Sequence, residues 1–231
     1  MKNKIININF IETPKADIKN ISDLQNYYRS IKHLIDARIA HWKKAWETAS
    51  DEELFAELVF CLFTPQSKAV FCWQSVCALA EQGMLLKSNA AQIAKVINKV
   101  RFRNNKAKYL IEARKIFLDK GIPKMREKLN SFGNGALLRA WIVKNIKGIG
   151  YKEAGHFLRN IGLCMDLAVL DRHILKNLKL LGAISDIPAS LSVKTYLDIE
   201  KQMKDFSNKI QIDMAALDIV LWCKESGGIF K

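Results

Sequence analysis

Helix-start signals recur along this sequence, and they are the feature that most limits the folds open to it. Ser22 with Gln25, and Ser50 with Glu53, have the spacing of a capping box, in which two side chains satisfy the first free backbone N–H groups of a helix. Period-two alternation of apolar and polar residues, which marks half-buried strands, is confined to residues 5–10. The sequence therefore predicts an all-α protein.

Further caps and breakers divide the chain into helices joined by short turns. Thr64 followed by Pro65 is typical of an N-cap before proline in the first helical turn, and Asp171 is typical of an N-cap after an apolar connector. Gly121 is expected to close a basic helix, and Pro123 to open the next. We expect helices over residues 22–46, 50–62, 65–83, a short one after Ser88, 104–119, a short one from 123, 135–146, 151–161, 171–182, 192–208 and 211–224.

The charge balance indicates a polyanionic partner. The chain has 231 residues, and its 37 Lys and Arg against 23 Asp and Glu give a net charge of +14. A surplus of that size favours nucleic acid first and an anionic membrane surface second. The alternative is that all proteins of the source organism are basic, in which case the charge indicates no particular partner.

The sequence shows no targeting segment and no paired-cysteine motif. No segment has the apolar length of a signal peptide or of a membrane helix, which needs about 18 residues, so we expect a cytoplasmic protein. Its cysteines number 5, and none forms a CxxC pair. This pattern argues against a disulfide framework, a zinc ribbon and an iron–sulfur cluster.

The segment Lys147-Gly148-Ile149-Gly150 separates two of the expected helices and predicts a compact helical hairpin. Gly148 and Gly150 permit positive φ and leave no Cβ in the path of a closely approaching ligand. The N-terminus of the following helix offers free N–H groups and a partial positive charge, which suit a phosphate. With Lys147 beside it, the hairpin favours DNA-backbone binding over an ordinary tight turn.

Lys152 and Asp171 are candidate catalytic groups on either side of an apolar connector. A lysine in its neutral form can attack C1′ of a sugar and form a Schiff base. An aspartate held ionised by the N-terminus of a helix can stabilise positive charge that develops on that sugar. Taken singly, a surface lysine and a plain helix cap are the favoured interpretations.

Together, these residues resemble a known superfamily. GIGYKEAGHFLRNIG followed by AVLDRHIL resembles the helix-hairpin-helix DNA glycosylases, whose signature is a hairpin, a lysine and then an aspartate after a short apolar run. By position, the resemblance makes Lys152 the catalytic lysine of the bifunctional members and Asp171 the catalytic aspartate.

Other segments point to one branch of that superfamily. The endonuclease III and adenine-glycosylase branches usually carry a C-terminal four-cysteine cluster, whereas this chain ends WCKESGGIFK. RFRNNKAKYLIEAR, FTPQSKA and the lysine-terminated tail resemble the archaeal and bacterial 8-oxoguanine DNA glycosylase/lyases of the second type, from about Ser50 to Lys231. The basic run from Arg101 to Lys108 is characteristic there, but no role beyond packing or phosphate neutralisation follows for it.

The resemblance also indicates residues that would hold a damaged base. Asp218 and Trp222 are four apart on one helix, where the carboxylate could accept from the two donors of a guanine edge and the indole could stack on its face. The alternative is a plain Asp and a core Trp on an amphipathic helix. The resemblance also makes Lys231 a pocket residue, and the alternative is a lysine in a fraying tail. Gln66 matches the position that fills the gap left by a flipped nucleotide, and the alternative is an exposed glutamine early in a helix.

The sequence prediction is thus a bifunctional 8-oxoguanine DNA glycosylase with abasic-site lyase activity. We expect two helical subdomains with a DNA groove between them, one of residues 51–162 and the other of residues 1–50 with 163–231. No metal or organic cofactor is expected, and the partner is damaged double-stranded DNA bound by a nucleoid-associated prokaryotic monomer. Two alternatives stay open: a glycosylase of the same superfamily for another damaged base, and a non-catalytic helix-hairpin-helix DNA-binding module.

Overall fold

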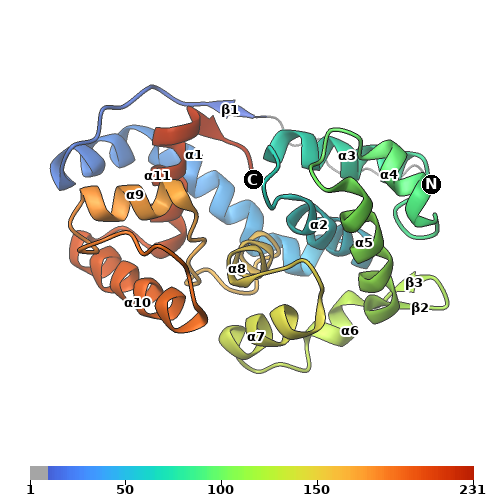
Figure 1. Ribbon diagram of the computed structural model, residues 1–231. Coiled ribbons are helices and arrows are strands. Elements are labelled where there is room, and N and C mark those ends of the chain that lie inside the picture. The colour runs from blue at the N-terminus through green and yellow to red at the C-terminus, as the bar shows by residue number, and fades with distance from the viewer. Residues whose placement is uncertain (1–9) are drawn as a thin grey trace.

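Helices dominate the computed structural model, which describes residues 10–231 (Figure 1). The predicted all-α class is confirmed. Of the strand expected over residues 5–10, residues 5–9 lie outside the described part, and Phe10 is not in a strand. The elements in chain order are β1 (Ile11–Glu12), α1 (Ile21–Thr48), α2 (Asp51–Phe63), α3 (Ala69–Glu81), α4 (Ala90–Val96), α5 (Arg103–Phe117), β2 (Leu118–Asp119), β3 (Ile122–Pro123), α6 (Met125–Leu129), α7 (Gly135–Asn145), α8 (Tyr151–Asn160), α9 (Arg172–Leu180), α10 (Val193–Ile210), α11 (Met214–Ser226) and β4 (Gly228–Ile229).

Buried side chains form two hydrophobic clusters. In Figure 1, the helices α2 to α5 of the first cluster and the helices α9 to α11 of the second lie on opposite sides of α8. The first cluster spans residues 54–167 and includes Phe230. The second cluster draws on α1, on α9 to α11 and on Ile229. The division of the chain into two subdomains at residues 51 and 163 stays a prediction, because packing alone does not show which segments fold independently.

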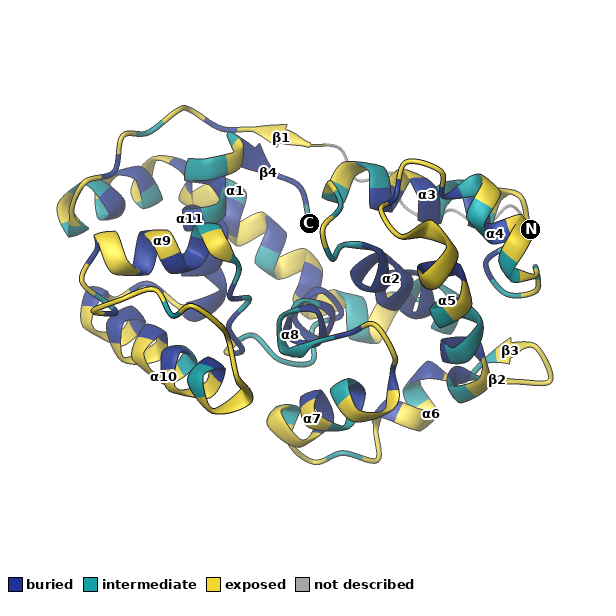
Figure 2. Cartoon of the chain, in the orientation of Figure 1, coloured by how far each residue is buried: buried dark blue, intermediate teal, exposed yellow. Residues whose placement is uncertain are grey.

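Helix α2 is the centre of the first cluster. Its capping box is formed as predicted, with the Ser50 side chain accepting from Glu53 N and the Glu53 side chain accepting from Ser50 N. After this acidic first turn every residue except Glu57 is apolar, and all residues from Leu54 to Phe63 are buried (Figure 2). A helix that is apolar all round must be covered on every side. α3, α5, α6 and α8 pack around it accordingly.

Helix α8 meets both clusters. Gly155 lies so close to the connector before α9 that an added Cβ would stand 3.0 Å from the Ala168 carbonyl oxygen. Gly162, which follows the helix with φ +81°, lies against the Trp42 carbonyl of α1, well inside the distance that a Cβ would tolerate. The two glycines therefore allow α8 to be packed between α1 and the following connector.

The last residues are tied to the beginning of the described chain. β4 pairs antiparallel with β1 in the register Ile11 with Ile229, and Thr13 N donates to the Gly227 carbonyl at 2.9 Å. Gly228 is pressed against the Ile11 carbonyl oxygen and the Phe10 ring. The tail after α11 is therefore held in place rather than fraying.

Two predicted N-caps are wrong. Asn20, not Ser22, caps α1, and Asn89, not Ser88, caps α4 with a complete capping box. Ser88 is unable to serve because its hydroxyl donates back to the Met84 carbonyl at 2.6 Å.

The end of the basic helix also differs from the prediction. α5 ends at Phe117, and Gly121, with φ +83°, lies in the two-residue turn of the β2–β3 hairpin. Pro123 belongs to β3 rather than opening a helix, and α6 begins at Met125.

Close packing at Gly162 predicts a specific loss of stability. Gly162→Ala and Gly182→Ala both place a side chain at positive φ, which costs roughly 1–2 kcal/mol. An added Cβ meets nothing within 4 Å at Gly182, whereas at Gly162 it meets the backbone of α1. Overpacking adds about 1–3 kcal/mol, so Gly162→Ala should lower the free energy of unfolding by that much more in urea denaturation. Equal losses in the two variants would contradict the tight α1–α8 contact.

Candidate functional site

A cavity of about 910 Å³ opens between the two clusters. It brings together six residues singled out from the sequence, which come from five parts of the chain: Gln66, Lys152, Asp171, Asp218, Trp222 and Lys231. The three hairpin positions Lys147, Gly148 and Gly150 do not line it.

One face of α8 supplies the polar wall of the cavity. Lys152, His156 and Arg159 follow one another at helical spacing and all line the cavity. Burial and the neighbouring cations lower the pKa of His156 well below its usual range, so its ring is neutral. The opposite face, with Ala154, Phe157 and Leu158, is buried in the first cluster.

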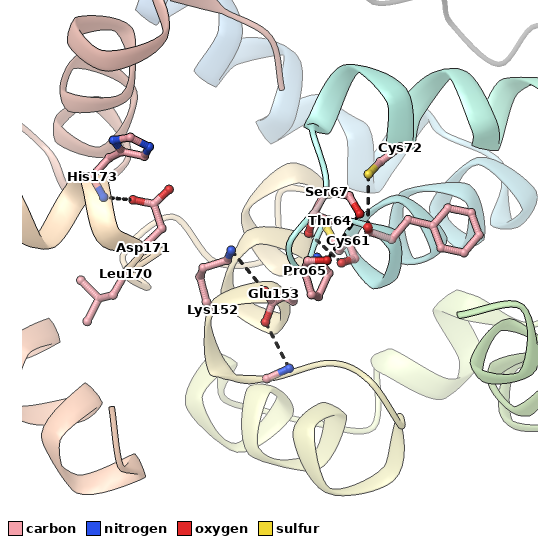
Figure 3. Close-up of polar contacts among 12 residues, drawn as sticks. Cys61, Thr64, Pro65, Ser67, Cys72, Lys152, Glu153, Leu170, Asp171 and His173 are labelled. Atoms are coloured by element: carbon pink, nitrogen blue, oxygen red, sulfur yellow. Dashed lines mark hydrogen bonds and ion pairs between the residues drawn. The ribbon is translucent and has the colours of Figure 1, made fainter. Parts of the chain in front are cut away.

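Lys152 lies in the first turn of α8. Its Nζ is 3.2 Å from Glu153 Oε1, and its side chain remains 29% exposed. Glu153 Oε2 accepts from Gly150 N at 3.3 Å, so the same carboxylate caps the helix and contacts the amine (Figure 3). The amine is therefore oriented by one partner and still open to the cavity.

Asp171 stands across the cavity from Lys152, immediately before α9 (Figure 3). The predicted cap is present: Asp171 Oδ1 accepts from His173 N at 2.8 Å and from Ile174 N at 2.9 Å. These two N–H donors hold the carboxylate in place at the positive end of the helix dipole. Its second oxygen carries no hydrogen bond from residues 10–231.

Asp218 and Trp222 lie on the second side of the cavity, on α11. Asp218 Oδ2 accepts a short hydrogen bond from Arg159 Nη1. Burial raises the pKa of the Asp218 carboxyl, and the Arg159 charge opposes that shift. Trp222 packs edge-on against His173, with ring centroids 5.9 Å apart. One carboxylate and one aromatic side chain thus line the same space.

Lys231 is anchored at the inner end of the cavity. Its Nζ is 2.6 Å from Glu57 Oε2 and 3.0 Å from the centre of the Trp73 ring, and its side chain is 3% exposed. Burial lowers the pKa of this ammonium, and the Glu57 charge opposes the shift. Glu57 also accepts from Asn160 Nδ2 at 3.2 Å, which joins α2, α8 and the chain terminus.

Gln66 reaches the cavity from a turn and not from a helix. The helix predicted to begin at Pro65 begins instead at Ala69, with Lys68 as its N-cap. Thr64 Oγ1 donates back to the Cys61 carbonyl at 2.8 Å, so it ends α2 and does not start α3. Gln66 itself is exposed with φ +57°, a left-handed conformation that is rare outside glycine.

The hairpin turn is built partly as predicted. Gly148 has φ +87°, and an added Cβ would collide with the Tyr109 ring of α5. Gly150 has φ −98° and needs no left-handed freedom, which corrects the sequence interpretation. Lys147 is exposed, with its Nζ 5.6 Å from the centre of the Tyr109 ring. Contact of this turn with a phosphate stays a prediction.

Sequence reasoning missed three residues of the site: Glu57, Glu153 and Arg159. A local signal existed for Glu153, which stands three positions after Gly150 as in a capping box. A periodic signal existed for Arg159, which is seven positions after Lys152 and shares its face. Glu57 lies within an otherwise buried apolar helix, and a charge in that setting is itself unusual.

The described residues, 10–231, contain no candidate metal site and no membrane-spanning helix. No three His, Cys, Asp or Glu side chains gather there in a way that could hold a metal ion. Every helix of that range is too short or too polar to cross a membrane.

Comparison with known proteins relates this geometry to a family. The family model described as 8-oxoguanine DNA glycosylase matches residues 35–212. A Fusobacterium nucleatum protein named 8-oxoguanine DNA glycosylase/AP lyase is 40% identical over 210 residues, covering 91% of this chain and 97% of that one. A Methanocaldococcus jannaschii protein with the same name is 35% identical over 218 residues, covering 93% and 99%.

Solved structures agree with the sequence comparison. The Methanocaldococcus jannaschii 8-oxoguanine glycosylase/lyase in complex with a 15mer DNA containing 8-oxoguanine has a TM-score of 0.82 and 32% identity, covering 91% of this chain and 99% of that one. The Thermotoga maritima 8-oxoguanine DNA glycosylase has a TM-score of 0.80 and 29% identity, covering 91% and 98%. The resemblance stated from the sequence is confirmed, and this chain belongs to the 8-oxoguanine DNA glycosylase family.

Proposed function

We propose that this protein excises 8-oxoguanine from double-stranded DNA and cleaves the strand at the resulting abasic site, with Lys152 as the nucleophile. One observation carries the proposal: the Lys152 amine and the Asp171 carboxylate line the same cavity, in a chain of this family. Of the other lysines that line this cavity, Lys231 pairs with Glu57 and is only 3% exposed, while Lys68 is exposed at the start of α3. Lys152 also contacts a carboxylate, that of Glu153, but its side chain stays 29% exposed. Lys152 is therefore the amine that we assign as the nucleophile.

The first step joins Lys152 to the sugar. The neutral amine attacks C1′ of the flipped nucleotide, the C1′–N9 bond breaks, and its electron pair leaves with the base, which then takes up a proton. The nitrogen, now bonded to C1′, is positively charged and loses one of its two protons. Glu153 Oε1, 3.2 Å from Nζ, can accept this proton.

The second step cleaves the strand. Opening of the sugar ring gives a Schiff base between Lys152 and C1′, which withdraws electrons from C2′. Loss of a C2′ proton to solvent gives an enamine with a C1′–C2′ double bond. The enamine then re-forms the C1′ imine, a C2′–C3′ double bond forms, and the C3′–O bond breaks with its electron pair leaving on the 3′ phosphate, which completes the β-elimination. Water finally hydrolyses the imine and returns the free amine.

Asp171 lowers the barrier of the first step. Positive charge develops on the deoxyribose as the C1′–N9 bond lengthens, and a fixed carboxylate on the far side of the cavity stabilises it. The two N–H donors on Oδ1 keep the carboxylate oriented before the reaction. Little reorganisation is then needed as the charge appears.

Base and backbone are held by separate groups in this proposal. Asp218 accepts from the guanine edge, Trp222 stacks on the base, Lys231 closes the inner end, and Gln66 fills the gap in the duplex. Lys147, Gly148 and Gly150 bind a phosphate outside the cavity. One chain supplies all of these residues, so the protein acts as a monomer.

Borohydride reduction during turnover tests the nucleophile. With a duplex that contains 8-oxoguanine, the wild-type protein should give a trapped covalent adduct, because the Schiff base is reduced to a stable amine. Lys152→Gln should give none, since an amide forms no imine. The measurement is the shifted protein–DNA band on a denaturing gel.

Lys68→Gln is the matched control, because it removes another lysine from the rim of the same cavity and should trap like the wild type. An adduct in Lys152→Gln would assign the nucleophile elsewhere. Trapping on an oxidised-pyrimidine duplex but not on 8-oxoguanine would favour another lesion, and binding without any adduct would favour a non-catalytic module.

Asp171→Asn tests the electrostatic role separately from the fold. Asparagine caps a helix about as well as aspartate, so the free energy of unfolding should change by less than about 1 kcal/mol. Loss of the negative charge should slow base release about 10²–10³-fold, as removal of one preorganised group does in other active sites. Single-turnover release of 8-oxoguanine is the measurement, and an unchanged rate would exclude this role.

A further inference from the structure

Lys106 is a buried lysine that the proposed chemistry does not use. It lies on α5 and is 4% exposed. Its Nζ donates to the Phe63 carbonyl at 2.7 Å, to the Pro65 carbonyl at 2.7 Å and to Ser67 Oγ at 3.1 Å. No carboxylate of residues 10–231 forms an ion pair with it. All three ammonium donors therefore point at one segment, residues 63–67, where α2 ends and the Gln66 turn follows.

This ammonium joins two loops at the cavity mouth. Ser67 Oγ, which accepts from Lys106, also accepts from Arg101 N at 3.0 Å. Both the turn that carries Gln66 and the loop that carries Arg101 line the cavity. The Ser67 hydroxyl thus links the two loops, and the Lys106 ammonium holds that hydroxyl.

The turn has a conformation that needs such support. Gln66 has φ +57°, which a residue with a side chain keeps only where its surroundings impose it. Burial lowers the pKa of the Lys106 ammonium to about 8, so the fold retains a costly buried cation at this place. A neutral apolar side chain would fill the same volume but leave the two carbonyls without their donor.

Arg114 provides an internal comparison. It lies on the same helix and donates to the carbonyls of Leu85 at 2.9 Å, Ser88 at 2.5 Å and Met84 at 2.6 Å. The loop that it holds, between α3 and α4, does not line the cavity. Helix α5 therefore holds two segments in the same way, by a cationic side chain that donates to several carbonyls. Of these two segments, only the one held by Lys106 lines the cavity.

We propose that Lys106 is a positioning residue for the flipped nucleotide: it holds the Gln66 turn and the Arg101 loop in the arrangement that lets Gln66 enter the duplex. The effect on the loops is a property of the free protein. The effect on turnover rests on the proposed function.

Hydrogen–deuterium exchange of the free protein tests the first part. Ser67 N donates to the Thr64 carbonyl and Arg101 N to Ser67 Oγ, so both amides are protected. Lys106→Met should speed their exchange about tenfold, because the support of both loops is lost. Arg114→Met should leave these two amides unchanged and speed exchange in residues 84–88. Lys108→Met, an exposed lysine on the same helix, should change neither.

A double-mutant cycle tests the second part. Lys106→Met should slow single-turnover release of 8-oxoguanine about tenfold, within the range that a displaced group can cause. In a Gln66→Ala background the same substitution should slow it less than about twofold, since Lys106 acts through Gln66. Arg114→Met should have less than about a twofold effect in either background.

The outcomes separate this proposal from the proposed function. Unchanged exchange at Ser67 and Arg101 in Lys106→Met, or independent effects of Lys106→Met and Gln66→Ala, would overturn the positioning role. Ser67→Ala removes the shared hydroxyl alone and should give the same pattern if Lys106→Met does not fold. Absence of excision by the wild type would overturn the proposed function, while the exchange result would still decide what Lys106 holds.

Discussion

Two pairs of buried charges at the junction between the clusters are the interactions on which the site depends. Arg159 of α8 pairs with Asp218 of α11, and Glu57 of α2 pairs with Lys231. Each charge would cost several kcal/mol to bury alone, so a partner must be present whenever the fold closes. The pairs therefore require α2, α8, α11 and the terminal residue to meet in one arrangement, and that arrangement is the cavity.

The cavity groups owe their positions to the ends of helices. Lys152 is in the first turn of α8, Asp171 caps α9, and Gln66 follows the end of α2. Backbone N–H and carbonyl groups have no partner within the helix at its ends, so nearby side chains form hydrogen bonds with them and are oriented by those bonds. The helices thus position these three side chains, which need few other contacts.

Local features of the site could be predicted from the sequence. The Ser50 box and the Asp171 cap involve residues only two or three positions apart, and both are confirmed. Thr64 was misassigned because its hydroxyl can bond either forward or backward, and sequence does not say which. Lys106 with Phe63, and Glu57 with Lys231, join positions far apart in the chain. Spacing rules for one helix do not predict such contacts, so the role of Lys106 within the basic run does not follow from the sequence.

Pairing of β1 with β4 has a consequence for how the protein acquires its reactivity. The two strands lie at nearly opposite ends of the chain, and closing so long a loop is an entropic cost that non-local contacts repay late in folding. Phe230 and Lys231 follow directly from β4, so the innermost wall of the cavity is completed by the same event. Until β1 and β4 pair, the cavity therefore lacks the part of its wall that Phe230 and Lys231 supply.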